Sequence, residues 1–391
     1  MKILIAGAGI GGLTAALCLQ TAGHEVTVFE QSSAFAEVGA GLQCGANALR
    51  VMEYLDLLTA IEEVSVAPER ADFRDHKTGD TIYSAGFGKA YKEKYGAPYL
   101  HVYRPDLHKV LYTSFLARGG EVQFNAQVSR FEEKSTEVAV HLHEGGIVQG
   151  ELLIAADGIK SALRAQIVGV KTPRFTGNVA WRGVLPTSRL PADFMDKIVS
   201  NFVGPGKHMV IYYLRQQRLV NFVAVTEDKQ WQEQSWVGKA PWEELKHAFS
   251  GWHPSVQQVI DNVDKGECYR WALFDHKPFQ PWSSGRATLL GDAAHATLPF
   301  MASGAAMAIE DARIMQRSLD ENSDVKTALD VYQRNRYGRT AQIQNDSARL
   351  GHLYHFRSRL MQKLAFKALG RVGRAKEDFL PGYDANLVVL K

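Results

Sequence analysis

The hydrophobic pattern of residues 1–30 predicts a strand, a helix and a second strand. The apolar run 2–6 favours a strand, segment 13–22 favours a helix that stops before Gly23, and segment 25–29 favours another strand. Two strands joined by a helix form a βαβ unit, in which the strands run parallel in one sheet. The chain therefore begins like a doubly wound α/β domain.

Later segments extend this pattern and then change it. We expect residues 121–131 and 138–143 to be strands of a hairpin, and 151–155 to be another strand of the parallel sheet. From 175 to 267 alternating segments favour a mainly antiparallel sheet of separate origin. Its expected strands are 178–185, 198–203, 208–214 and 219–226. Helices are expected at 47–58, 242–249, 254–263, 325–342 and 348–372.

Composition narrows the class of protein. A chain of 391 residues exceeds what one core usually covers, so we expect two domains. A net charge of +3, with dispersed Lys and Arg, gives no reason to expect nucleic-acid binding. The three cysteines lie far apart, which favours a reducing compartment. No uncharged run approaches membrane-spanning length, so we expect a cytoplasmic protein without a membrane contact.

A glycine-rich turn separates the first strand from the first helix. In the sequence 7–12, GAGIGG, Gly7 permits a tight turn, Gly9 lets a pyrophosphate approach the backbone, and Gly12 lets the helix pack on the strand. Glu30 ends the next strand, where an acid that binds a ribose is expected. The unit therefore predicts a dinucleotide site, and this motif alone leaves FAD and NAD both open.

A second signature lies at 289–312, LLGDAAHATLPFMASGAAMAIEDA. A short apolar strand ends in Gly291-Asp292, a loop containing Pro299 follows, and Gly304 begins a helix of small residues. Asp292 stands beyond the carboxyl end of a strand, where open α/β sheets bind ligands, and its carboxylate can accept hydrogen bonds from a polyol. The N–H groups at the start of the helix could face an electron-rich ring.

Other candidate residues indicate a function less strongly when each is considered alone. Asp157-Gly158 follows a buried strand, and Arg104 stands at the mouth of a helix, where it is solvated or pairs with a phosphate or flavin ring. The glycine-rich segment 37–47 is a flexible connector or a backbone wall beside a cofactor. His208 and Tyr212 share one face of a strand. For these two residues and for Arg182, packing in the core and contact with a ligand are equally open interpretations.

Two further kinds of site are disfavoured. His352 and His355 have a spacing that could suit a metal, but no carboxylate or cysteine cluster accompanies them, so we expect no metal site. The sequence contains no GxSxG elbow, and Asp292 with His295 lacks a nucleophile, which disfavours a hydrolase.

Taken together, GxGxxG with Glu30, AADGIKSALR around Asp157 and GDAAHATLP around Asp292 resemble the single-component FAD-dependent aromatic hydroxylases. The resemblance covers nearly the whole chain. MAxGAxMAIEDA and the HMxxYY segment are similar to the 6-hydroxynicotinate branch, whereas many salicylate-type members read PxxGxGxG at 299–306. Where the 6-hydroxynicotinate branch has a histidine in the GAGxHxGxN loop, this chain has Gln43.

The resemblance implies an α/β fold with a Rossmann-like (GR2-type) FAD-binding domain, a mixed or antiparallel substrate domain, and C-terminal helices. The FAD-binding domain is expected at 1–70, 100–174 and 268–347, the substrate domain at 71–99 and 175–267, and a helical segment at 348–391. The implied FAD contacts are Gly7, Gly9, Gly11, Gly12, Glu30, Gln31, Gly41, Arg104, Val128, Asp157, Asp292, Pro299, Gly304 and Ala305. The implied substrate contacts are Gln43, Arg182, His208, Tyr212 and Pro299, with Tyr212 and His208 as catalytic candidates.

The implied reaction is hydroxylation of a small hydroxylated aromatic or N-heteroaromatic acid. NADH or NADPH reduces FAD, O2 adds to give a flavin C4a-hydroperoxide, and its distal oxygen attacks an electron-rich ring carbon. The sequence leaves decarboxylation and the choice between monomer and homodimer open. The alternatives are a flavin monooxygenase for a larger polycyclic substrate such as an antibiotic, a non-oxygenating FAD reductase or oxidase, and a non-enzymatic FAD-binding module.

Overall fold

The predicted βαβ unit forms the middle of a six-stranded sheet. In the computed structural model, which describes residues 1–35, 40–169, 172–228, 237–376 and 378–391, β1 runs parallel to both β2 and β12. The strand order is β19-β20-β12-β1-β2-β8. Its strands are β1 (Lys2–Ala6), β2 (Glu25–Phe29), β8 (Glu121–Gln123), β12 (Leu152–Ala155), β19 (Ser283–Ser284) and β20 (Ala287–Leu289). Every residue of β12 and β20 is buried, as expected for strands covered on both faces.

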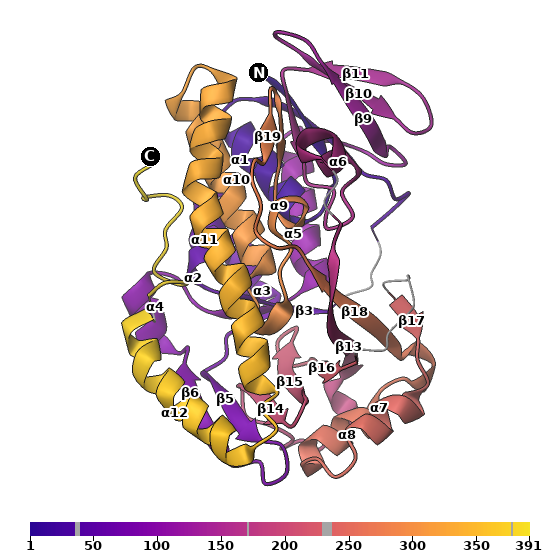
Figure 1. Cartoon of the computed structure of the whole chain (residues 1–391), viewed down its shortest axis with the longest axis vertical. Helices are drawn as coiled ribbons and strands as arrows, with labels where there is room; N and C mark the ends of the chain where they lie inside the picture. Colours follow the sequence, from indigo (N-terminus) through magenta and orange to yellow (C-terminus); the bar gives the residue numbers. More distant parts are fainter. Residues whose placement is uncertain (36–39, 170–171, 229–236, 377) are drawn as a thin grey trace.

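Long helices pack against this sheet. Figure 1 shows α11 running along the length of the molecule beside α10. These helices are α1 (Ile10–Thr21), α5 (Arg104–Ala117), α10 (Gly304–Glu321) and α11 (Val325–Tyr354). Helix α1 begins earlier than the sequence pattern predicted, because Gly11 and Gly12 lie inside it, and α10 starts at Gly304 as predicted.

An eight-stranded sheet forms the second large layer, in the order β17-β18-β13-β16-β15-β14-β5-β6. Its neighbouring strands are antiparallel except that β14 runs parallel to β5. The strands are β5 (Arg70–Asp75), β6 (Thr81–Gly86), β13 (Arg174–Pro186), β14 (Val199–Gly204), β15 (Lys207–Leu214), β16 (Leu219–Glu227), β17 (Val237–Lys239) and β18 (Tyr269–Asp275). The sheet thus combines segments far apart in sequence, and α7 and α8 lie on one side of it (Figure 1).

Two small sheets and several short helices complete the described chain. The β3-β7-β4 sheet comprises Gly41–Cys44, Leu100–Tyr103 and Ser65–Val66, and the β11-β10-β9 sheet comprises Ile147–Gly150, Val138–Leu142 and Val128–Glu133. The remaining α-helices are α2 (Ala46–Tyr54), α3 (Leu58–Glu63), α4 (Lys89–Tyr95), α6 (Ala162–Val168), α7 (Trp242–Ala248), α8 (Pro254–Asn262), α9 (Asp292–His295) and α12 (Arg359–Lys376). The 3-10 turns are η1 (Thr187–Arg189), η2 (Lys265–Glu267) and η3 (Pro299–Met301).

Two predicted elements were wrong in extent. Segment 121–131 is two strands in two sheets, because the backbone turns at Asn125, which has a φ of +53°. The helix predicted at 47–58 is split into α2 and α3, and Asp56, with a φ of +60°, lies at the break. Both residue types tolerate the left-handed region, so a turn can interrupt an apolar pattern without Gly or Pro.

The C-terminal helices also differ from the prediction. The sequence pattern predicted a break between 342 and 348, but α11 continues to Tyr354 and α12 begins at Arg359. The helix continues because its last turns pack on the loop 296–302. Gly351 allows this contact, since a Cβ there would lie 2.4 Å from the Phe300 ring. Among the described residues, no helix is long and apolar enough to span a bilayer.

Candidate functional site

The glycine-rich turn after β1 leaves one side of its backbone open. Gly7 has a φ of +104°, and a Cβ on it would lie 2.4 Å from the Ala156 carbonyl oxygen. A Cβ on Gly12 would lie 1.9 Å from the Gly7 oxygen, so both positions require glycine. Around Gly9, in contrast, a Cβ would meet no described atom within 4 Å. Because the first N–H groups of α1 lack helical partners, they and this open space suit a phosphate.

Glu30 and its neighbours flank the turn. The Glu30 carboxylate accepts hydrogen bonds from the Ala8 N–H at 3.1 Å and the Ser32 N–H at 2.9 Å. Glu30 therefore fixes the turn and keeps acceptor capacity for a ribose hydroxyl. Gln31 beside it is exposed, and Val128 begins β9 in a buried position.

Asp157 follows β12 with one oxygen unsatisfied. Its Oδ2 accepts a hydrogen bond from the Leu163 N–H at 3.4 Å, whereas its buried Oδ1 has no hydrogen-bond partner within the described chain. Burial raises the pKa of this carboxyl, and the neighbouring Ser161 and Leu163 oppose the rise. A buried acceptor without a partner is costly, which fits a donor supplied by a bound molecule.

Buried charges hold the turn that presents Asp292. The Asp311 carboxylate accepts from the Gly291 N–H at 3.1 Å and lies 2.5 Å from His295 Nε2. Arg336 donates to Asp311 at 2.7 Å and also pairs with Glu310 at 2.8 Å. This network fixes both the strand end and α9.

The Asp292 side chain itself is open to solvent, although protein groups surround it. The protein groups around the Asp292 carboxyl partly desolvate it and thereby raise its pKa, while the neighbouring His295 and Arg104 lower it. Arg104 is exposed at the start of α5, and its N–H donates to the Ala40 carbonyl at 3.1 Å. The structure therefore places a carboxylate and a guanidinium, from distant strand and helix ends, within electrostatic range of each other.

The loop after Asp292 is shaped by α11. Ser347 Oγ donates to the Leu298 carbonyl at 2.7 Å, and the Tyr354 hydroxyl donates to the Phe300 carbonyl at 3.3 Å. Pro299 begins η3, and Ala302 after it adopts a left-handed φ of +49°. The half-buried Gly304 and Ala305 then begin α10, so their N–H groups stand at a helix start.

Three polar side chains share one face of the eight-stranded sheet. Tyr212 pairs across strands with Asn221, and Arg182 pairs with Val223, two residues farther along β16. Strand alternation therefore places Arg182, Asn221 and Tyr212 on the same face. Arg182 Nε and Asn221 Nδ2 are buried and find no hydrogen-bond partner among the residues described. Burial lowers the pKa of Arg182, and the nearby Tyr212 opposes this shift.

Strand β3 closes over this face. The Gly41 N–H donates to Asn221 Oδ1 at 2.8 Å, and a Cβ on Gly41 would lie 2.5 Å from the Tyr212 hydroxyl oxygen. Gln43 accepts a hydrogen bond from the Tyr99 hydroxyl at 2.7 Å. Burial raises the pKa of Tyr212, and the charge on Arg182 and a hydrogen bond with Gln43 oppose this rise. Tyr212 thus keeps its proton at neutral pH.

His208 lies on the same sheet face but away from Tyr212. Its Nδ1 is 2.9 Å from His355 Nε2, and its ring packs near Phe300 and Tyr354. His355 Nδ1 in turn lies 3.5 Å from Glu227. Burial drives the pKa of His208 well below its usual range. The structure therefore places the two catalytic candidates in different side-chain clusters, and it separates His355 from the exposed His352.

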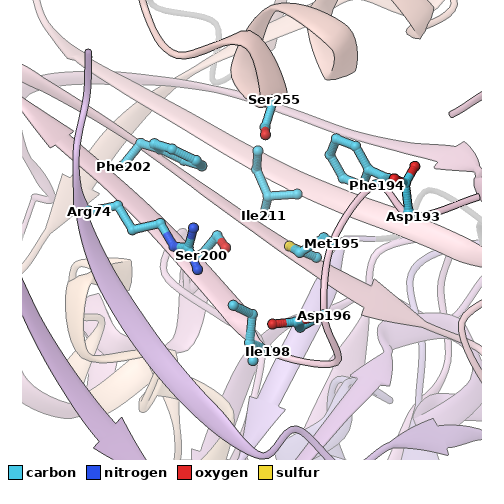
Figure 2. A pocket seen from close by; sticks show the side chains of 10 residues that line it. All are labelled: Arg74, Asp193, Phe194, Met195, Asp196, Ile198, Ser200, Phe202, Ile211 and Ser255. Carbon is cyan, nitrogen blue, oxygen red and sulfur yellow. The ribbon is translucent and has the colours of Figure 1, made fainter. Parts of the chain in front are cut away.

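A pocket of about 220 Å³ lies on the opposite face of this sheet (Figure 2). Ile211 and Phe202 point into it, and these residues alternate with those of the polar face. Its lining comprises Arg74, Asp193, Phe194, Met195, Asp196, Ile198, Ser200, Phe202, Ile211 and Ser255. None of the predicted site residues lines this pocket, so it is distinct from the candidate site.

Sequence reasoning missed His101, Asn221, Asp311 and Arg336. The neighbours of all four come from other elements, and spacing along the chain gave no signal for His101 and Asn221. Asp311 and Arg336 could have been found as charged residues on otherwise apolar helix faces. Residues 37–39 of the predicted glycine-rich loop lie outside the described residues.

Comparisons with known proteins agree with this geometry. Residues 1–347 match the family described as FAD binding domain. The chain is 36% identical over 388 residues to 3-hydroxybenzoate 6-hydroxylase from Polaromonas naphthalenivorans, covering 98% of this chain and 94% of the relative. It is 34% identical over 354 residues to 6-hydroxynicotinate 3-monooxygenase from Bordetella bronchiseptica, covering 88% and 90%.

The solved structure of Klebsiella pneumoniae HpxO complexed with FAD and uric acid superposes with a TM-score of 0.86 at 26% identity, covering 97% of this chain and 96% of that chain. A salicylate hydroxylase substrate complex shares the fold, with a TM-score of 0.83 at 24% identity over 98% and 96%. The predicted fold class is confirmed. The chain therefore belongs to the FAD binding domain family, among the FAD-dependent aromatic hydroxylases that its motifs resemble.

Proposed function

We propose that this protein is a FAD-dependent monooxygenase that hydroxylates a small hydroxylated aromatic or N-heteroaromatic acid with NADH or NADPH and O2. The observation that carries this proposal is the polar face formed by Arg182, Asn221 and Tyr212, with two buried nitrogens unpaired within the described chain. Unpaired buried donors are costly unless a ligand pairs them. A cationic, donor-rich face suits an aromatic carboxylate.

The residues at the strand ends fit FAD. The open backbone at Gly9 and the α1 N-terminus suit the pyrophosphate, Glu30 suits a ribose, and the unpaired Asp157 oxygen accepts a further donor. We assign binding of the ribityl hydroxyls to Asp292, whose pKa the charge on Arg104 lowers. Bound at these residues and reduced by NAD(P)H, FAD would supply the activation of O2, of which one atom would enter the substrate ring and the other would leave as water.

On the substrate side, we assign anion binding to Arg182 and hydrogen-bond donation to Tyr212. Because Tyr212 stays protonated, it donates to a phenolate oxygen rather than removing a proton. Together with the cationic Arg182, this favours the ionised, electron-rich form of the ring. The loop 299–305, which α11 holds in place, would then exclude water from the reacting atoms.

We also propose the broader organisation. FAD binding is assigned to 1–70, 100–174 and 268–347, substrate binding to 71–99 and 175–267, and a supporting role to 348–391. Three free, buried cysteines suit a reducing compartment, which favours the cytoplasm. Size-exclusion chromatography with light scattering distinguishes monomer from homodimer.

The test uses the purified yellow protein with a panel of hydroxylated benzoates and pyridine carboxylates. We expect at least one acid to stimulate NADH or NADPH consumption and to give a product heavier by one oxygen, or a decarboxylated hydroxylated product. Labelled O2 should appear in that product. Stimulated consumption without label would favour a reductase or oxidase, and a colourless protein that does not bind added FAD would contradict the whole proposal.

A further inference from the structure

His101 is a buried histidine whose ring nitrogens lack hydrogen-bond partners. It lies in β7, between β3 and β4, and only 1% of its surface is exposed. Neither Nδ1 nor Nε2 makes a hydrogen bond of normal geometry within the described residues, although the ring lies close to the Tyr213 main chain. A buried imidazole normally pairs at least one nitrogen, because leaving both unpaired loses hydrogen bonds that water would supply. A partner from outside the chain would remove this cost.

The surroundings of His101 belong to the candidate substrate site. His101 is the direct cross-strand partner of Gln43 in the β3–β7 pair, so the two side chains project from the same face. The His101 ring centroid lies 4.5 Å from that of Tyr212 and 6.1 Å from that of Tyr99. The Tyr99 hydroxyl already donates to Gln43, which leaves the imidazole as the unpaired acceptor of this group.

His208, in the neighbouring eight-stranded sheet, is a buried histidine that does have a partner within the protein. It is 3% exposed, and its Nδ1 lies 2.9 Å from His355 Nε2. The difference between the two histidines is therefore hydrogen bonding rather than burial. Only His101 combines two unpaired nitrogens with contact to Tyr212.

We propose that His101 binds the substrate directly: as the aromatic acid binds, and before the ring oxygen to which Tyr212 donates is ionised, one imidazole nitrogen accepts a hydrogen bond from a hydroxyl, amino or ring N–H group of the acid. This inference rests on the proposed function and adds a specificity-determining residue to it. Arg182 would bind the carboxylate, and His101 would select rings that carry a hydrogen-bond donor. Rings without such a donor would leave the imidazole unpaired and bind less tightly.

The chemistry of the site favours hydrogen-bond acceptance over proton removal. Burial lowers the pKa of His101 to about 3, although a contact with the Tyr213 main chain opposes the shift, so the ring is neutral at physiological pH and is a weak base. A neutral imidazole offers one acceptor and one donor. His101 can therefore orient the ring substituent without becoming a buried cation beside Arg182.

The test compares rings with and without the hydroxyl in variants that retain FAD. The variants are His101→Leu, which removes both nitrogens, and His101→Gln and His101→Asn, which keep an acceptor near Nε2 and Nδ1 respectively. The exposed His247→Gln serves as the surface control. For each holoenzyme, Kd is measured from the flavin spectral change with 3-hydroxybenzoate, 6-hydroxynicotinate and unsubstituted benzoate, alongside FAD content and thermal midpoint.

We expect His101→Leu to weaken binding of the hydroxylated acid that the wild type prefers by about tenfold or more while leaving the Kd for benzoate unchanged, because one hydrogen bond is lost only with the hydroxylated ring. One of the two amide variants should recover part of the affinity. The exchange Gln43→His with His101→Gln, which moves the imidazole to the cross-strand position, should recover it as well.

Equal losses for both rings, or no loss for either, would overturn the role of His101. If the leucine variant does not retain FAD, the amide variants decide: wild-type affinity in one of them supports the assignment, and no hydroxyl preference in either overturns it. A wild type that binds none of the acids and shows no stimulated NADH consumption would instead refute the proposed function.

Discussion

The carboxylate of Asp311 accepts a hydrogen bond from the main-chain N–H of Gly291 at 3.1 Å, across 20 residues of sequence. A residue inside α10 thereby fixes the turn that presents Asp292. The same carboxylate contacts His295 and Arg336, so one buried acid links the strand end, α9 and α11. The position of Asp292, the acid proposed to bind the cofactor, therefore depends on a buried charge elsewhere in the chain.

Replacing Asp311 by Asn should destabilise the protein by about 3–5 kcal/mol, because Arg336 and His295 lose a buried partner. Urea unfolding of the holoenzyme measures this change. Asp320→Asn, an exposed position in the same helix, is the control and should change stability little. A variant as stable as the wild type would contradict the role assigned to the network.

The stability that Asp311 contributes should also depend on pH. Burial raises the pKa of its carboxyl, but His295 and Arg336 outweigh burial and bring it to about 2. Because this folded-state pKa lies below the unfolded value of about 3.9, the contribution is fully present above pH ~4 and is lost as pH falls toward 2. The stability difference between wild type and Asp311→Asn should therefore shrink over this window. A constant difference would be inconsistent with the assigned pKa.

Ala302 holds a left-handed φ of +49° in the loop before α10. Replacing it by Gly removes a backbone strain of about 1–2 kcal/mol and adds unfolded-state entropy, so we expect a net change between zero and about 1 kcal/mol of stabilisation. Thermal unfolding measures it. Ala306→Gly, inside α10, is the matched control and should destabilise by roughly 1 kcal/mol. Equal losses at both positions would contradict the strain argument.

Asp292→Ala should reduce FAD retention, because the ribityl hydroxyls lose their proposed acceptor. The ratio of flavin absorbance to protein absorbance after purification measures occupancy. Asp292→Asn, which keeps one acceptor oxygen without the charge, should retain more FAD than the alanine variant. Full yellow occupancy in Asp292→Ala would remove this residue from the cofactor site.

Several of these relationships could be predicted from the sequence. The others could not, because they depend on contacts between residues that are far apart along the chain. Gly7, Gly12 and Asp292 could be found because turn chemistry and strand ends are local features. The pairing of His208 with His355 spans 147 residues, and the register that sets His101 opposite Gln43 comes from two strands joined by a long excursion. Strand alternation gave the right face for Tyr212 but not the separate cluster in which His208 lies.

Arg182→Gln should raise KM for the aromatic acid by about 10- to 100-fold, since a charge-assisted hydrogen bond to the carboxylate is lost. FAD content should stay unchanged, because Arg182 lies on the face proposed to bind substrate rather than the cofactor. The control is Arg174→Gln in the same strand β13, where the arginine pairs with Asp275 at 2.6 Å. If both variants raise KM equally, carboxylate binding by Arg182 is ruled out.

Tyr212→Phe should lower the fraction of NADH or NADPH consumption that yields hydroxylated product, while FAD remains bound. The hydroxyl of Tyr212 is proposed to donate to the phenolate oxygen, and its removal leaves the ring less electron-rich at the attacked carbon. Because burial raises the pKa of Tyr212, its own titration adds no pH dependence between about pH 6 and 9, and the defect should lessen only as rising pH ionises the substrate hydroxyl without help. Product yield per reduced nicotinamide, measured across this range, tests both statements.

The neighbouring Tyr213 offers a matched control for this variant. Tyr213 projects from the opposite face of β15, and its hydroxyl donates to the Met195 carbonyl at 3.0 Å. Tyr213→Phe should therefore cost about 1 kcal/mol of stability without changing the coupling of reduced nicotinamide to product. If Tyr212→Phe retains wild-type coupling, or if both variants lose it equally, the hydroxyl of Tyr212 has no specific part in the reaction.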